Sequence, residues 1–94
     1  MEKTVYKLSA DVVFAYNIFS ADTQRNLNFS VTADICRDSF SDAVAAFKAY
    51  VGNVAYSAIV LSIPELVKKR VEGVLSISYG CEQEGYSDAD TDTV

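Results

Sequence analysis

The 94-residue chain contains no histidine, and this absence excludes several kinds of active site. Neither a Ser–His nor a Cys–His catalytic arrangement can form, and a histidine-containing zinc motif is excluded for the same reason. The chain has only two cysteines, Cys36 and Cys81, which are too few for a disulfide scaffold. We therefore expect two free thiols and a reducing, cytoplasmic setting, with a Cys36–Cys81 bridge as the less favoured alternative.

Glycine, proline and long apolar runs are also scarce. The four glycines and the single proline stand where helices or strands are expected to begin or end, and no phosphate-binding loop or dinucleotide fingerprint is present. No apolar run approaches the roughly 18–20 residues of a membrane span, and the first residues lack the charged-then-apolar build of a secretory signal. We expect a protein that is not an enzyme, holds no cofactor or metal and has no membrane partner.

The acidic residues are unevenly distributed. The net charge is −5, and residues 82–94 contain five acids and no base. The remaining acids and bases balance, so residues 1–81 are neutral as a whole. Tyr86 is the only large apolar group of the C-terminal segment, which therefore cannot offset its own ordering entropy. The sequence predicts a single compact domain at residues 1–81, able to fold alone, and an acidic C-terminal tail at residues 82–94.

Residues 4–18 and 27–36 alternate between apolar and polar positions, as expected of two strands that each bury one face. The apolar positions are even in the first strand and odd in the second. A hairpin must therefore pair even with odd residue numbers to bury both sets. A turn at residues 22–25 satisfies this condition and puts Tyr16 opposite Val31. In that register Phe14 and Phe29 lie on the same covered face.

A helix is expected after Ser39, whose hydroxyl can cap it with Asp42 three residues on. Its apolar stripe runs along one side, and Gly52–Asn53 is the expected end. Residues 55–63 read as a central strand because Ile59, Val60 and Leu61 are apolar on both faces. Ser62 and Pro64 then predict a second, short helix that ends at Lys68–Arg70 and Gly73, followed by a strand at residues 74–79.

These elements predict an α+β fold: a two-layer, four-stranded mixed sheet in the order β-β-α-β-α-β, with two helices on one face. The other sheet face is expected to carry small and mostly uncharged side chains, which a partner's backbone or a second copy of the sheet could approach closely. These residues are Lys7, Ser9, Asp11, Ala15, Asn17, Ser30, Thr32, Asp34, Ser76 and Ser78.

The chain is similar, in size and general character, to small non-enzymatic proteins of phages and mobile elements. Many of those bind and block a host protein, so the resemblance implies a protein-binding module or inhibitor. We expect a protein partner with a basic surface, or a second copy bound through the open sheet face. Lys68–Arg70 is the expected internal anchor for the tail. The candidate partner-binding residues are Ser30, Thr32, Ser76 and Ser78 on the sheet, and Glu82, Glu84, Tyr86, Asp88, Asp90 and Asp92 in the tail.

Two other functions remain open. Eleven aromatic residues would suit a single-stranded nucleic-acid-binding protein with an acidic tail, although a neutral domain lacks the positive groove that such binding normally requires. Asp11, Asp34 and Asp38 could form the carboxylate group of a metal-dependent nuclease, if the hairpin brought the first two together. Asp88–Asp92 copies the first half of a calcium-binding loop but lacks its later glycine and glutamate, so we expect no calcium site.

Overall fold

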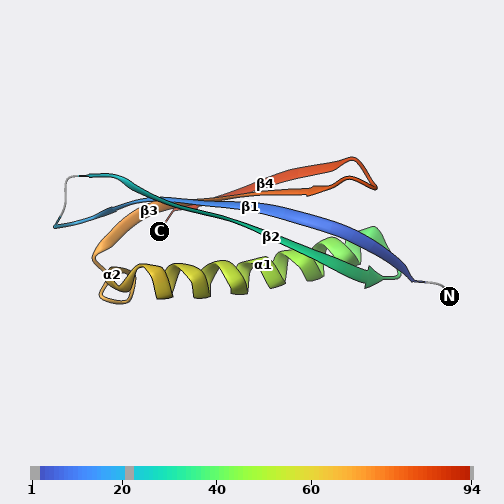
Figure 1. Ribbon diagram of the computed structural model, residues 1–94, viewed down its shortest axis with the longest axis horizontal. Coiled ribbons are helices and arrows are strands. Elements are labelled where there is room, and N and C mark those ends of the chain that lie inside the picture. Colours follow the sequence, from blue (N-terminus) through green and yellow to red (C-terminus); the bar gives the residue numbers. More distant parts are fainter. Residues whose placement is uncertain (1–2, 21–22, 94) are drawn as a thin grey trace.

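The computed structural model describes residues 3–20 and 23–93, which form a sheet and one helical layer (Figure 1). The sheet has four strands in the spatial order β2-β1-β3-β4, and each neighbouring pair is antiparallel. The elements in chain order are β1 (Thr4–Ile18), β2 (Arg25–Arg37), α1 (Phe40–Ser62), α2 (Pro64–Val67), β3 (Val71–Cys81) and β4 (Tyr86–Thr93). The predicted α+β class, with four strands and two helices, is confirmed. The expected mixed sheet is wrong, because all three strand pairs are antiparallel. The order of elements is β-β-α-α-β-β, without the predicted strand between the two helices.

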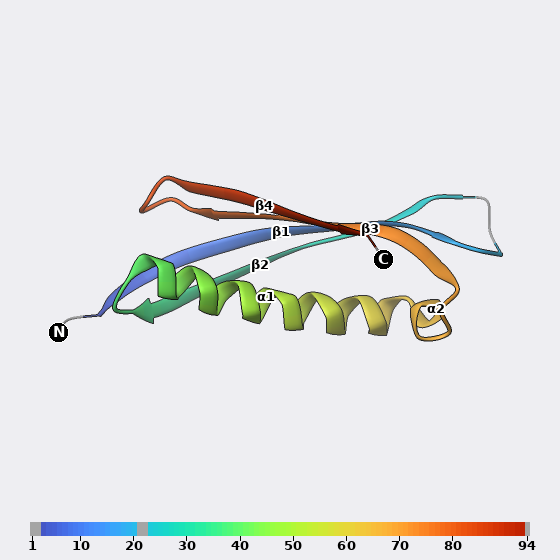
Figure 2. The ribbon, with the colours of Figure 1, turned by 180° about the vertical axis from the view of Figure 1, so that it is seen from behind.

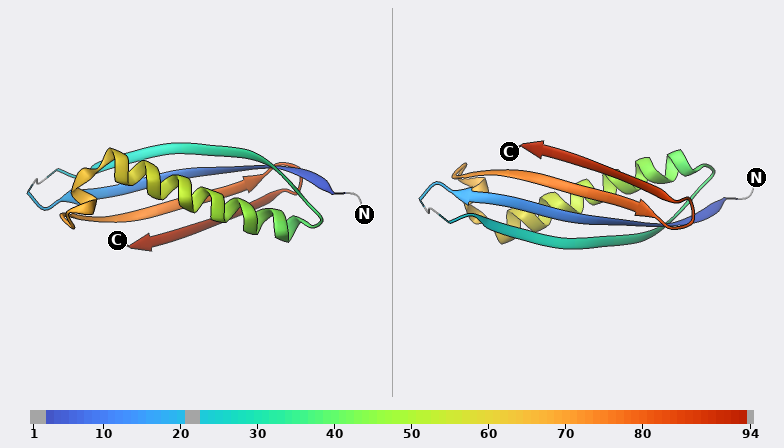
Figure 3. Two further views of the ribbon diagram at one scale, coloured as in Figure 1. Left: turned by 90° about the horizontal axis from the view of Figure 1, so that it is seen from below. Right: turned by 90° about the horizontal axis from the view of Figure 1, so that it is seen from above.

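The long helix α1 is the first difference between the predicted and the observed elements. It crosses one face of the sheet obliquely (Figure 3) and continues through Gly52 to Ser62, so the predicted strand at residues 55–63 does not exist. Its buried residues recur every four positions without interruption: Ala43, Phe47, Val51, Ala55 and Ile59. The run Ile59–Leu61 misled the prediction because short apolar runs do not distinguish a buried strand from a helix. Gly52 is tolerated inside the helix, where its position faces open space.

The ends of both helices only partly follow the sequence pattern. Ser39 caps α1 as predicted, and its hydroxyl accepts a hydrogen bond from the Asp42 N–H at 3.2 Å. Ser62 does not cap α2, because it is still the last residue of α1, and α2 begins after Ile63 without a side-chain cap. Contrary to our expectation, α1 has the length and composition of a membrane span. Core helices of soluble proteins can share this composition, and α1 buries one stripe of its surface against the sheet.

The acidic C-terminal segment is the second difference, because most of it forms a strand and not a tail. Residues 86–93 form β4, which pairs with β3 along its whole length at the edge of the sheet. An edge strand needs only the backbone groups of its neighbour, so it can be ordered without a core of its own. The expected tail is thus part of the sheet. Whether residues 1–81 fold without it stays a prediction.

The hairpin of β1 and β2 buries the predicted faces but in another register. Tyr16 pairs with Arg25 rather than with Val31. Alternation fixes which side chains share a face, and any shift by an even number of residues keeps that assignment. Phe14 and Phe29 therefore lie on the same helix-covered face, as predicted: Phe14 is buried and Phe29 packs against the core. Of the predicted turn at residues 22–25, Asp22 lies outside the described residues and Arg25 already belongs to β2.

The core between sheet and helix has two parts. The larger is built around Leu8, Val12 and Phe47, and the smaller lies near α2 around Phe14 and Ile63. The molecule is elongated, with principal extents of 55 × 21 × 17 Å. The α2 end and the β3–β4 turn lie at opposite ends of its long axis (Figure 2). The surface cavity beside the β3–β4 turn and the one at the α2 end are consequently far apart.

Candidate functional site

One face of the sheet has no covering layer in the described structure, as the view from above shows (Figure 3, right). We call it the open face. Its side chains are exposed or half-buried, and pairing aligns them in rows across the four strands. It comprises Val5, Lys7, Ser9, Asp11, Val13, Ala15 and Asn17 of β1, Asn26, Asn28, Ser30, Thr32, Asp34 and Cys36 of β2, Glu72, Val74, Ser76, Ser78 and Gly80 of β3, and Ser87, Ala89, Thr91 and Thr93 of β4.

Charge is sparse on the open face. Its charged side chains are Lys7, Asp11, Asp34 and Glu72, and Lys7 lies directly opposite Asp34 in the register. Asp11 accepts a hydrogen bond from the Ser30 hydroxyl at 2.8 Å. Because most of the remaining side chains are no larger than valine, another protein surface can approach the backbone closely over all four strands.

β4 continues this face through its own alternation. Ala89 pairs with Ser78 and Thr91 with Ser76, which adds small side chains to two rows of the open face. Asp88, Asp90 and Asp92 alternate with them and therefore stand on the helix side of the same strand. The segment that looks uniformly acidic in the sequence thus separates its charges from the open face.

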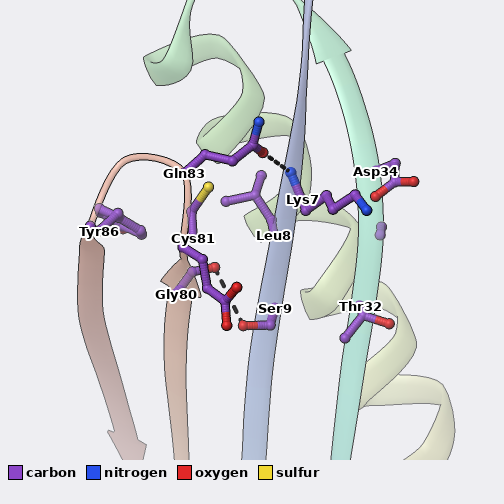
Figure 4. Close-up of a pocket in the computed structure, with 12 residues that line it drawn as sticks. Lys7, Leu8, Ser9, Thr32, Asp34, Gly80, Cys81, Gln83 and Tyr86 are labelled. Carbon is purple, nitrogen blue, oxygen red and sulfur yellow. Dashed lines mark hydrogen bonds between the residues drawn. The ribbon is translucent and has the colours of Figure 1, made fainter.

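A hollow of about 860 Å³ lies at one end of the open face, beside the β3–β4 turn. Figure 4 shows Lys7, Ser9, Thr32 and Asp34 around it. Glu82 also lines it, so two carboxylates and one ammonium group surround the hollow. These charged groups can pair with a charged side chain of a bound protein.

Gln83 fixes the rim of this hollow. Its Oε1 accepts from the Lys7 backbone N–H at 2.7 Å (Figure 4), and its Nε2 donates to the Val5 carbonyl at 3.2 Å. Its side-chain amide thereby replaces the backbone of a neighbouring strand where the pairing of β1 with β3 ends at Leu8. The Ser9 hydroxyl also donates to the Gly80 carbonyl, at 3.4 Å.

Lys48 holds the acidic strand on the helix side. Its Nζ lies 2.9 Å from an Asp88 carboxylate oxygen and 3.8 Å from one of Asp90. It also stands 5.0 Å from the centre of the Tyr79 ring, within range of a cation–π interaction. The expected anchor at Lys68–Arg70 is wrong, since that cluster lies at the α2 end and the ion pairs of the described residues involve Lys48.

The acids of this strand are electrostatically coupled to Lys48. The Lys48 hydrogen bond lowers the pKa of the Asp88 carboxyl, with further donation from the Ala89 N–H and the Tyr86 hydroxyl. The same bond raises the pKa of Lys48, whose ordinary value is 10.5. Desolvation raises the pKa of the Tyr79 hydroxyl, and the nearby Asp90 carboxylate adds to this effect. Tyr86 also packs edge-on against Phe40, with ring centres 5.2 Å apart.

We expect Lys48→Met to loosen β4 while the rest of the fold stays intact. Amide hydrogen exchange at Ala89–Thr91, measured at neutral pH by mass spectrometry or NMR, should become a few-fold faster than in the unaltered chain. Lys68→Met is the matched control and should leave this exchange unchanged. Equal exchange in the two variants would contradict the role of Lys48 as the anchor.

The pKa directions give the pH dependence of this attachment. Because the Asp88 pKa is lowered in the folded state, its stabilisation is present above the ordinary carboxyl range and is lost as the pH falls through the folded pKa. The raised Lys48 pKa adds stabilisation that is complete below 10.5 and is lost at higher pH. The attachment of β4 should therefore be strongest near neutral pH, and high salt should weaken it.

The structure separates the sequence-predicted site residues into two groups. It brings Ser30, Thr32, Ser76 and Ser78 together on the open face. Asp88, Asp90 and Asp92 lie on the opposite side of β4, while Glu82 and Glu84 belong to the turn before it and Tyr86 begins the strand. The sequence reasoning missed Lys48, Gln83, Ala89 and Thr91. The alternation of Ser87–Thr93 was the signal that could have identified β4.

The carboxylates proposed for a metal centre do not converge. Asp11 pairs with Ser30, and Asp34 pairs with Lys7, which is four residues away from Asp11 along β1. At ~3.3 Å per residue this separation is roughly 13 Å, so one ion cannot bind both. Within residues 3–20 and 23–93, no group of three or more potential metal ligands is found. The cysteines are also apart and unbridged, with Cys36 exposed and Cys81 buried.

No family model, curated protein or solved structure matches the chain.

Proposed function

We propose that this protein is a non-enzymatic protein-binding module whose partner covers the open face. The observation that carries the proposal is the low density of charge on the open face, where Lys7, Asp11, Asp34 and Glu72 are the charged side chains among small and polar ones on four strands. Charged residues are depleted at the centre of protein interfaces, where they would have to lose their water. β4 supports this interpretation because it contributes serine, alanine and threonine to the open face and places its aspartates elsewhere.

The hollow beside the β3–β4 turn suits an anchoring side chain of the partner. Asp34 and Glu82 line it together with Lys7, and carboxylates pair best with the planar fork of arginine. Interface energy concentrates in such pockets near a surface of small, well-packed residues. We therefore expect a partner with a basic group that enters the hollow, as a host protein blocked by a small phage or mobile-element inhibitor would supply.

A nucleic-acid function receives less support. Lys7 is the only base on the open face, and it lies opposite Asp34. Nucleic-acid surfaces neutralise phosphates with several lysines and arginines, and the described open face does not offer such a row. A nuclease is disfavoured for the reason given above, since Asp11 and Asp34 do not converge.

Arginine substitutions on the open face test the proposal. Thr32→Arg and Ser78→Arg should each abolish capture of the partner because they place a long charged side chain where close approach is needed. Both positions are exposed, so the thermal midpoint should change little. Ser57→Arg, an exposed position on α1, is the control and should bind normally.

The measurement is quantitative mass spectrometry of proteins captured from a lysate by each variant, followed by a binding titration with the purified partner. Light scattering of the unaltered chain separately tests whether the partner is a second copy. The proposal fails if the same stoichiometric partner binds Thr32→Arg and Ser78→Arg as tightly as it binds the unaltered chain. Binding of a labelled oligonucleotide with a steep salt dependence would instead support the nucleic-acid alternative.

A further inference from the structure

A second cavity, of about 580 Å³, lies on the helix side of the molecule at its α2 end. We call it the apolar groove. Phe14, Ala55, Ile59, Leu66 and Leu75 form most of its wall, and Tyr56, Val60 and Val67 add further apolar surface. Tyr56 and Val67 remain 68% and 66% exposed, so the groove opens to solvent between α1 and α2. Its volume is in the range of small-molecule sites, which extends from roughly 300 to 1,000 Å³.

Two charged residues also line the groove. Lys69 follows α2, and Asp92 comes from β4, so the groove has a basic and an acidic wall. The ion pairs found in the described part of the chain involve Lys48 and not Lys69. Lys68 and Arg70 are exposed beside Lys69 but do not line the groove. The charges thus favour one orientation of a bound molecule, with any anionic end at Lys69.

The backbone of Lys69 provides a second, independent observation. Its N–H donates to the Leu66 carbonyl at 3.1 Å, and the Arg70 N–H donates to the Glu65 carbonyl at 2.9 Å. These two bonds form a Schellman motif at the end of α2, in which Lys69 occupies the left-handed position with φ 56°. Glycine is the usual residue there because a Cβ atom is unfavourable in this conformation.

Lys69 is the only residue other than glycine with a positive φ in the described chain. Backbone strain of this kind clusters at functional sites, where it positions a group that the site needs. A glycine would adopt the left-handed conformation at a lower cost in free energy, but it would remove the single cation of the groove wall. The structure therefore combines a strained lysine with an apolar cavity at the same place.

From this geometry we infer that the apolar groove binds an anionic amphiphile, specifically the chain of a fatty-acid-like carboxylate. The hydrocarbon chain lies along Ala55, Ile59 and Leu75, and the carboxylate pairs with the Lys69 ammonium group. Asp92 excludes the reverse orientation by charge repulsion. The site is on the helix side and is independent of the open face, so either proposal can fail without the other.

Two ligands of equal chain length separate the contribution of charge from that of apolar contact. Dodecanoate and dodecanol should both be titrated below micelle-forming concentrations, with backbone amide shifts of Ala55 and Ile59 followed by NMR. The carboxylate should bind roughly fivefold more tightly, which is the upper end expected for an exposed ion pair. Equal affinity for the two ligands, or shifts spread over the whole surface, would overturn the inference.

Lys69→Gly should stabilise the protein and at the same time weaken the binding of dodecanoate. Relief of the left-handed strain should raise the thermal midpoint by roughly 4–8 °C. Dodecanoate affinity should fall about fivefold to the level of dodecanol, whose affinity should not change. Lys68→Gly is the control, since Lys68 has a negative φ and does not line the groove. Unchanged dodecanoate affinity in Lys69→Gly would overturn the proposed carboxylate contact.

A third variant tests whether the ligand enters the groove. Gly52 lines it, and a Cβ at that position would meet nothing within 4 Å, so Gly52→Leu should fold and fill part of the groove. Both ligands should then bind at least tenfold more weakly, while Asn53→Leu, beside it but outside the groove, should leave binding unchanged. If Gly52→Leu binds normally, the groove is not the site. A concentration-dependent dimer that Gly52→Leu dissociates and dodecanoate does not would assign the groove to a second copy of the chain.

Discussion

Phe14→Ala is expected to destabilise the protein by about 3–5 kcal/mol. Phe14 is among the largest fully buried side chains, with 1% of its surface exposed. It packs with Ile18, Ile59 and Ile63 between the sheet and α1, and its ring stacks on Tyr16 at 5.3 Å. Removal of the ring would leave an empty space beside the apolar groove, which the sheet cannot close. Since small domains are stable by only about 5–15 kcal/mol, this loss is a large fraction of the total.

Urea unfolding monitored by far-ultraviolet circular dichroism measures this change. Phe19→Ala is the matched control, because Phe19 is 65% exposed and its loss should cost less than about 0.5 kcal/mol. A loss of less than about 1 kcal/mol for Phe14→Ala would show that the smaller core part does not hold α1 on the sheet.

Gly73→Ala should be the second most damaging change, with an expected loss of about 3 kcal/mol, at the upper end for overpacking. A Cβ at this position would stand 2.7 Å from the Ala15 carbonyl oxygen and 2.8 Å from both the Phe14 ring and the Tyr16 Cβ. The carbonyl belongs to the central strand β1 and cannot move without disturbing its ladder with β2. Gly73 was expected to mark the end of the second helix, but it lies inside β3, opposite Tyr16.

Gly80→Ala provides the comparison within the same ladder. Gly80 pairs with Ser9 of β1, and a Cβ there would meet the flexible Ser9 hydroxyl at 3.4 Å. We expect it to be nearly neutral in the same urea experiment. If Gly73→Ala is equally neutral, the close approach of β1 and β3 is not a constraint on the fold, and the smaller core part can expand.

Several features of the fold could be predicted from short-range patterns. Alternation identified β1 and β2 and the face that each one buries, and Ser39 with Asp42 identified the start of α1. The same reasoning predicted that Ser30, Thr32, Ser76 and Ser78 share an exposed sheet face, and the structure places them there. In each case the signal depends only on side-chain direction along one element, which the backbone geometry of a strand or a helix determines.

The Lys48–Asp88 ion pair and the apolar groove could not be predicted from short-range patterns, because each depends on residues far apart in the sequence. The Lys48–Asp88 ion pair joins positions separated by 40 residues, and it exists only because β4 joins the edge of the sheet that α1 covers. The groove likewise needs Phe14, Ile59 and Asp92 from three separate elements, and Lys69 from the turn after α2.

The sequence by itself determined local periodicity, the balance of charge and the residue types that exclude histidine chemistry. Only the tertiary structure decided the register of the hairpin, the helical state of residues 55–62 and the strand at residues 86–93. The physical reason is the same for all three: local patterns leave alternatives of similar energy, and contacts with distant segments select among them. For residues 86–93, the backbone of β3 supplies those contacts, which no property of the acidic segment alone could show.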